Sequence, residues 1–159
     1  MVDEQLHIRV ATQDDIEAMM DLVQTLFAIE TDFEFFSGKT RDGLGLLLAR
    51  PDQARVMVAE YLGDIVGMGT LQLLISTAEG GVVGLLEDMV VDENWRGRGV
   101  GRLLLQSLER WGIAHGVRRL QLLADRQNRP ALSFYAALGW SATELVALRR
   151  YPDTDAAVT

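Results

Sequence analysis

The stretch RGRGVGRLLL, residues 96–105, combines three glycines and three arginines immediately before an apolar run. The apolar residues Leu104, Leu108 and Trp111 follow at helical spacing and predict a helix that begins inside this stretch. Arginines at that end meet the positive pole of the helix dipole, which disfavours cations. Glycine-rich turns at a helix N-terminus expose backbone N–H groups that bind phosphates. We therefore expect this turn to bind an anion.

Composition and charge narrow the class of protein. The 159-residue chain is 48% hydrophobic and 24% charged, which is typical of globular proteins. Its length suits one domain, here expected over 1–152 with a frayed tail at 153–159. The net charge of −8 argues against a nucleic-acid binder, which usually carries a basic face. Because there is no cysteine and only His7 and His115 are present, we expect no metal site.

The sequence also carries no sign of membrane insertion or export. Its N-terminus, MVDEQLHIRV, lacks the basic and apolar regions of a signal peptide. No apolar run approaches the roughly 18 residues that a membrane span needs. We therefore expect a cytoplasmic protein.

Apolar periodicity and turn residues predict an α+β (mixed α/β) domain. The expected strands cover 7–12, two segments within 54–76 joined at Gly63–Asp64, 82–91, 117–124 and 140–151. The expected helices cover 16–27, 40–50, the segment from the quoted stretch to about 115, and 131–138. The resulting order is β-α-α-β-β-β-α-β-α-β.

The glycine turn fits neither of two common nucleotide motifs. A dinucleotide fingerprint requires G-x-G-x-x-G, but Arg102 occupies the place of its third glycine. A P-loop requires a closing Gly-Lys-Ser/Thr, which is absent. What remains is the pattern Arg96-x-x-Gly99-x-Gly101 between a strand and a helix, whose bare backbone can wrap a pyrophosphate.

This pattern resembles the acetyl-CoA motif of the GCN5-related N-acetyltransferases (GNAT), Gln/Arg-x-x-Gly-x-Gly/Ala after a strand. A second segment, NRPALSFYAALGW, resembles the family's Asn-x-x-Ala-x-x-Phe-Tyr-x-x-x-Gly-Phe, with Trp140 in place of the last phenylalanine. The matching positions are Asn128, Ala131, Phe134, Tyr135 and Gly139. The resemblance implies a GNAT-like domain with a central, mostly antiparallel sheet flanked by helices.

The resemblance also implies where acetyl-CoA binds as co-substrate. Its pyrophosphate would lie on the amides of Arg98–Gly101, with arginines around it, and its pantetheine would bond the preceding strand like an added strand. In this family that strand splays from the next one, which leaves backbone groups free. The residues so implied are Met89, Val90, Val91, Arg96, Gly97, Arg98, Gly99, Val100, Gly101, Arg102 and Asn128. For Asn128, a helix cap before Pro130 is an equal alternative.

Acetyl transfer to an amine needs a base for the amine, a donor to the thioester oxygen and an acid for the thiolate. Alternation along a strand points Glu87 and Asp88 to opposite faces. We favour Glu87 as the base because it then shares a face with Met89 and Val91. Asp88, a water molecule or a purely structural carboxylate pair stay open as alternatives. A backbone N–H near Met89 or Val90 is the expected donor to the thioester oxygen.

Tyr135 is the expected general acid. It follows Phe134 on a short helix, so the two rings project about 100° apart and one can pack while the other reaches the cofactor. The resemblance places its hydroxyl near the CoA sulfur, where it would protonate the departing thiolate. A structural hydrogen bond from this hydroxyl is the alternative.

The acceptor is expected to be a primary amine of a small, cationic molecule that attacks directly in a ternary complex. The segment ETDFEFF, residues 30–36, mixes Glu30, Asp32 and Glu34 with three phenylalanines and suits such an amine. A plain loop with core anchors would have the same composition. A protein N-terminal or lysine acetyltransferase and a non-catalytic acyl-CoA sensor stay open, as does a homodimer.

Overall fold

The computed structural model describes residues 3–30 and 32–152, and the expected tail at 153–159 lies outside them. The chain divides into two compact units, Met1–Asp125 and Arg126–Thr159. We call them the N-terminal and the C-terminal unit. The expectation of one domain over 1–152 stays a prediction.

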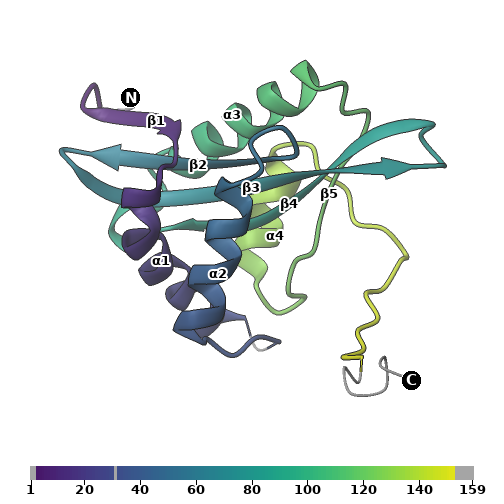
Figure 1. Ribbon diagram of the computed structural model, residues 1–159, viewed down its shortest axis with the longest axis horizontal. Helices are drawn as coiled ribbons and strands as arrows, with labels where there is room; N and C mark the ends of the chain where they lie inside the picture. The colour runs from purple at the N-terminus through teal and green to yellow at the C-terminus, as the bar shows by residue number, and fades with distance from the viewer. Residues whose placement is uncertain (1–2, 31, 153–159) are drawn as a thin grey trace. The chain divides into compact units, whose positions relative to one another are not determined.

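A five-stranded sheet forms the centre of the N-terminal unit, with its strands in the spatial order β1-β2-β3-β4-β5 (Figure 1). The strands are β1 Leu6–Val10, β2 Ala54–Tyr61, β3 Asp64–Ser76, β4 Gly81–Val91 and β5 Leu120–Leu122. The pairings from β1 to β4 are antiparallel, and β4 pairs with β5 in parallel. The expected mostly antiparallel sheet and the hairpin between β2 and β3 are thus confirmed, but its turn lies at Leu62–Gly63, one residue earlier than the expected Gly63–Asp64, and Asp64 begins β3.

The helices follow the apolar periodicity closely. The N-terminal unit contains α1 Ile16–Ile29, α2 Ser37–Leu48 and α3 Val100–Ala114, with short 3-10 turns η1 Gln13–Asp15 and η2 Glu93–Trp95. The C-terminal unit contains α4 Arg129–Ala137. Gly116 and Gly139, which follow α3 and α4, have φ of 82° and 90°, as expected of glycines that end helices.

Helices α1 and α2 cover one face of the sheet, and α3 covers the other (Figure 1). On the first face, Met19 of α1 packs in one cluster with Val58 of β2 and Val90 of β4. On the second face, a Cβ at Gly67 of β3 would lie 3.1 Å from Cδ1 of Leu104 in α3. Because both faces of the middle strands are buried, the sheet is a rigid platform for the end of β4.

The chain differs from expectation near its C-terminus. β5 covers Leu120–Leu122 rather than 117–124, and no strand is assigned within 140–152, where one was expected over 140–151. Alternating apolar residues raise strand propensity, but a strand forms only where a neighbour pairs with its backbone. Leu145 and Leu148 are 81% and 92% exposed, so this segment buries no apolar face either.

The length and the apolar character of a helix decide whether it can cross a bilayer. Within 3–30 and 32–152, none of the helices combines the length and the apolar character that crossing a membrane requires.

Candidate active site

Helix α3 begins at a turn that contains two left-handed glycines. Gly97 and Gly99 have φ of 71° and 84°, a region that glycine enters without steric cost. In this described segment no side chain caps the helix at Gly99, and its first turn holds no acidic residue. The first backbone N–H groups of α3 therefore lack side-chain acceptors, and the helix dipole adds positive potential. A Cβ at Gly97 would meet nothing within 4 Å, so the approach to the turn is open.

Hydrogen bonds hold the loop between β4 and α3 against the sheet. The Asp92 N–H donates to the Val66 carbonyl of β3 at 2.9 Å, and the Trp95 N–H donates to the Asp92 carbonyl at 2.8 Å. Arg96 Nε donates to the Val91 carbonyl at 3.0 Å. Arg96, expected beside the phosphates, therefore also ties the loop to the end of β4.

One edge of β4 has no strand partner beyond Leu86. The parallel pairs with β5 run from Gly84–Leu120 to Leu86–Leu122 and stop there. Among the described residues no strand pairs with this edge over Glu87–Val91. This is the splay that the resemblance implies, and it leads along the chain directly into the glycine turn.

A β-bulge interrupts β4 at Asp88. The β3–β4 register shifts between Met68 and Thr70, so Gly69 stands opposite both Asp88 and Met89. Asp88 has φ of 51°, a left-handed conformation that aspartate adopts more readily than most side-chain-bearing residues. The bulge thus adds one residue to β4 at the point where the free edge begins.

The bulge overturns the expectation that Glu87 shares a face with Met89 and Val91. An extra residue in one strand reverses the in–out alternation beyond it. The Met89 side chain lies on the α3 face, because a Cβ at Gly69 would collide with the Met89 sulfur and lie 3.0 Å from Cδ1 of Leu108. Glu87 therefore lies on the face that α1 and α2 cover.

Acidic side chains near the bulge and the end of α1 influence one another electrostatically. Burial, and then the carboxylates of Glu87 and Glu30, raise the pKa of Asp88 to about 6. Partial burial also raises the pKa of Glu87. The pKa of Glu30 is raised by burial and then by the Asp125, Asp32 and Glu87 carboxylates. Because a raised pKa strengthens a carboxylate as a general base, Asp88 suits this role as well as Glu87 does. We call these five residues the acidic cluster.

Sequence reasoning missed Thr70, which lies beside the bulge. Its side chain is on β3, the residue is 1% exposed, and its hydroxyl donates to the Glu87 carbonyl at 3.0 Å. A threonine within a strand gives no local signal of such a role, since the bond depends on the β3–β4 register. Asp125 was missed for the same reason, because it meets Glu30 only through the fold.

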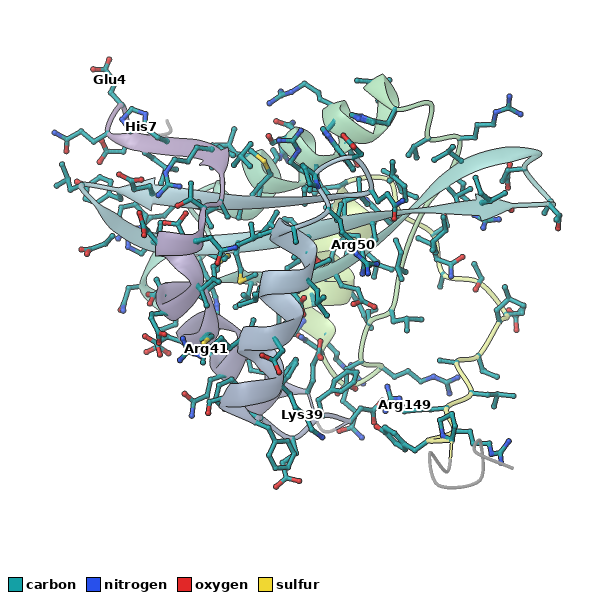
Figure 2. The ribbon with its side chains drawn as sticks, viewed as in Figure 1. Glu4, His7, Lys39, Arg41, Arg50 and Arg149 are labelled. Atoms are coloured by element: carbon teal, nitrogen blue, oxygen red, sulfur yellow. The ribbon has the colours of Figure 1, made fainter. Side chains whose placement is uncertain are left out.

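Phenylalanines alternate with acidic residues in the segment after α1, and one of them contacts Phe27 of α1. Phe27 and Phe33 stack with ring centroids 5.3 Å apart. Lys39, at the start of α2, lies 4.8 Å from the centroid of the Phe36 ring (Figure 2). Phe33 and Phe36 are 43% and 48% exposed. The segment therefore presents aromatic surface rather than serving only as an anchor in the core.

Asn128 and Tyr135 belong to the C-terminal unit. The Asn128 side-chain oxygen accepts a hydrogen bond from the Ala131 N–H at 3.2 Å, so the cap expected as one alternative is present. The Tyr135 ring packs edge-on against Phe134 and Trp140, with centroids 5.1 Å and 5.7 Å away. Their roles toward the pantetheine arm and the sulfur stay predictions.

Comparison with known proteins identifies relatives over most of the chain. The profile of the acetyltransferase (GNAT) family matches residues 17–140. An uncharacterised N-acetyltransferase of Methanocaldococcus jannaschii is 26% identical over 140 residues, 87% of this chain; the chain spans 62% of that relative's length. An aminoglycoside N(6')-acetyltransferase type 1 of Stenotrophomonas maltophilia is 32% identical over 108 residues, which cover 66% of this chain and 71% of the relative.

A solved structure shares the fold. It is a predicted acetyltransferase from Clostridium acetobutylicum, determined with acetyl-CoA. It superposes with a TM-score of 0.76 at 18% identity, covering 91% of this chain and 96% of that one.

Proposed function

Because this chain belongs to the acetyltransferase (GNAT) family, we propose that it transfers the acetyl group of acetyl-CoA to a primary amine of a small molecule. The observation that carries the proposal is one continuous path in the N-terminal unit. It begins at the unpaired edge of Glu87–Val91, follows the loop tied down by Arg96, and ends at the uncapped N-terminus of α3.

The donors along this path suit the two ends of acetyl-CoA differently. Backbone N–H groups of Met89–Val91 that do not face β3 can donate to the amide-bearing pantetheine arm as a neighbouring strand would. The uncapped amides from Val100 onward, with Arg98 and Arg102 nearby in the chain, suit the pyrophosphate. The fit rests on the chemistry of these donors, all of which seek acceptor oxygens.

When bound, acetyl-CoA would supply the activated thioester. The acidic cluster would take the proton from the attacking amine, with Asp88 or Glu87 as the base, directly or through water. A backbone N–H near Met89 would donate to the developing oxyanion, because a bulge turns backbone groups out of the ladder. Tyr135 would hold a proton for the departing sulfur and Asn128 a contact to the pantetheine arm, as the resemblance implies.

The acceptor side supports a cationic amine. The carboxylates of Asp125, Asp32 and Glu87 help to raise the pKa of Glu30 after burial, and those of Glu87 and Glu30 help to raise the pKa of Asp88 after burial. A cation would relieve this repulsion. Exposed rings of Phe33 and Phe36 add faces that attract ammonium groups. One relative is named for the N-acetylation of aminoglycosides, which favours an amine of a small molecule here as well.

An acceptor screen with acetyl-CoA tests this function. Free primary amines, including amino sugars, polyamines and aminoglycosides, are mixed with the protein, and release of the CoA thiol is followed. We expect release that depends on a small amine and exceeds hydrolysis without amine. Peptides with free N-termini or lysines form a separate arm. Release only with peptides would replace this proposal with a protein acetyltransferase, and binding without any release would indicate a sensor.

A further inference from the structure

Three side chains form a stack beside the glycine turn that the sequence motif does not include. Tyr61 ends β2 and Trp95 ends η2, and their ring centroids lie 4.5 Å apart at an interplanar angle of 51°. The guanidinium carbon of Arg98 lies 4.9 Å from the centroid of the Trp95 ring. We call Tyr61, Trp95 and Arg98 the aromatic stack.

The indole of this stack is fixed to the sheet. The backbone N–H of Trp95 donates to the Asp92 carbonyl, and the Asp92 N–H donates to the Val66 carbonyl of β3. The Tyr61 ring comes from the far end of β2, so contacts from two distant parts of the chain restrict Trp95. Trp95 is half-buried, whereas Arg98 is exposed. The indole is therefore the more enclosed member of the pair, and the arginine is the more exposed one.

Stacking leaves the charge of Arg98 available. A guanidinium that lies over a ring uses its face, while its N–H donors point outward in the plane. Among the described residues no carboxylate forms an ion pair with Arg98. Arg96 differs, because its Nε already donates a hydrogen bond to the Val91 carbonyl. Arg98 thus lies over the Trp95 ring, and its N–H groups form no ion pair with a described carboxylate. It directly precedes Gly99, whose backbone is left-handed.

We propose that Trp95, supported by Tyr61, is a positioning residue that orients Arg98 for the phosphate groups of acetyl-CoA. The inference rests on the proposed function, since it requires the glycine turn to hold those phosphates. Preorganisation raises affinity because the arginine loses less conformational freedom on binding. The effect belongs to cofactor binding, so it should appear in Kd and in the KM for acetyl-CoA, and kcat should change little.

The test is calorimetric titration of the full chain with acetyl-CoA. We expect Trp95→Leu to weaken binding about fivefold, the range of an exposed cation–π contact, and Trp95→Phe to restore most of the affinity. Arg98→Gln should weaken binding about tenfold, because it also removes a phosphate contact. The double variant should bind no more weakly than Arg98→Gln alone, since Trp95 acts through Arg98. Arg110→Gln, in α3 and exposed as Arg98 is, is the charge-matched control and should bind as the parent does.

The outcomes separate this inference from the proposed function. Failure of the parent to bind acetyl-CoA would overturn both. Parental affinity in Trp95→Leu, or fully additive losses in the double variant, would overturn the positioning role alone. Should Trp95→Leu fail to fold, Trp95→Met keeps apolar bulk without an aromatic face. Weaker binding by Trp95→Met than by Trp95→Phe then supports the role, and equal binding overturns it.

Discussion

Asp88 joins two unusual properties in one residue. Its backbone is left-handed, and its carboxyl carries a pKa raised to about 6 by burial and by the Glu87 and Glu30 carboxylates. Backbone strain and a perturbed pKa both concentrate at functional sites. Asparagine tolerates the same backbone region, so Asp88→Asn changes the charge and leaves the conformation in place.

This raised pKa predicts how stability depends on pH. The native state binds the Asp88 proton more tightly than the unfolded state does, so its contribution is present below about pH 4 and lost as pH rises through 6. Asp88→Asn should therefore unfold with a free energy about 3 kcal/mol higher than the parent at pH 8, and no higher at pH 3.5. Urea denaturation at both values measures this, with the exposed Asp52→Asn as control. A parent as stable as Asp88→Asn at pH 8 would contradict the burial of this charge.

At the level of single residues, glycines were easier to predict than carboxylates. Gly97 and Gly99 lie in the turn expected before α3, and both have a positive φ, which few other residues adopt without strain. The prediction that Glu87 shares a face of the sheet with Met89 and Val91 was wrong, because it assumed strict alternation along β4. The bulge that breaks this alternation arises from pairing with Gly69 and has no signature within residues 82–91.

The bulge of β4 is the element that connects fold to chemistry. Thr70 on β3 donates its buried hydroxyl to the Glu87 carbonyl and so fixes the residue that precedes Asp88. A bulge without this bond can slide toward regular pairing, which would move the acidic side chains relative to the free edge.

Substitutions at Thr70 test this link. Thr70→Val keeps the shape and removes the hydroxyl, so we expect kcat to fall about tenfold through misplacement of the base, while the KM for acetyl-CoA changes little. Thr70→Ser keeps the hydroxyl and should retain most of the parental kcat. Steady-state kinetics with a saturating amine compares them. Equal kcat values for the two variants would show that the hydroxyl does not serve the bulge.

Whole elements were predicted more reliably than their ends. The hairpin of β2 and β3 and the helix after the glycine turn were confirmed, because turn residues and apolar periodicity are local signals. The short β5 and the segment 140–152 were not, because strand length depends on which neighbour pairs with the backbone. The free edge of β4 is itself the product of that short pairing.

At the scale of the whole N-terminal unit, charges of opposite sign gather at two different places. The chain has a net charge of −8, yet it gathers three arginines at the start of α3. Acidic residues gather instead at the end of α1, around the bulge. An anionic cofactor and a cationic amine would thus each be attracted to a different surface, which sorts the substrates electrostatically.

Neutralising part of the acidic surface tests its role. Asp32→Asn with Glu34→Gln should raise the KM for a cationic amine about tenfold, because two exposed charges each contribute a modest attraction. Acetyl-CoA affinity should not change. The pair Asp52→Asn with Asp64→Asn controls for net charge, because both residues are exposed, Asp52 in the turn before β2 and Asp64 at the first position of β3. Equal effects on both substrates, or none on either, would remove this segment from the acceptor site.

Binding of acetyl-CoA at the glycine turn is the most direct measurement of all. Calorimetric titration of the parent should give binding, and acetyl-CoA at 100 times its Kd should stabilise the fold by about 2.7 kcal/mol. Gly99→Val should abolish the binding, because a branched side chain blocks the phosphates. Gly116→Val places the same strain at the other end of α3, where φ is 82°, and should bind acetyl-CoA as the parent does. A folded Gly99→Val variant with parental affinity would contradict the site.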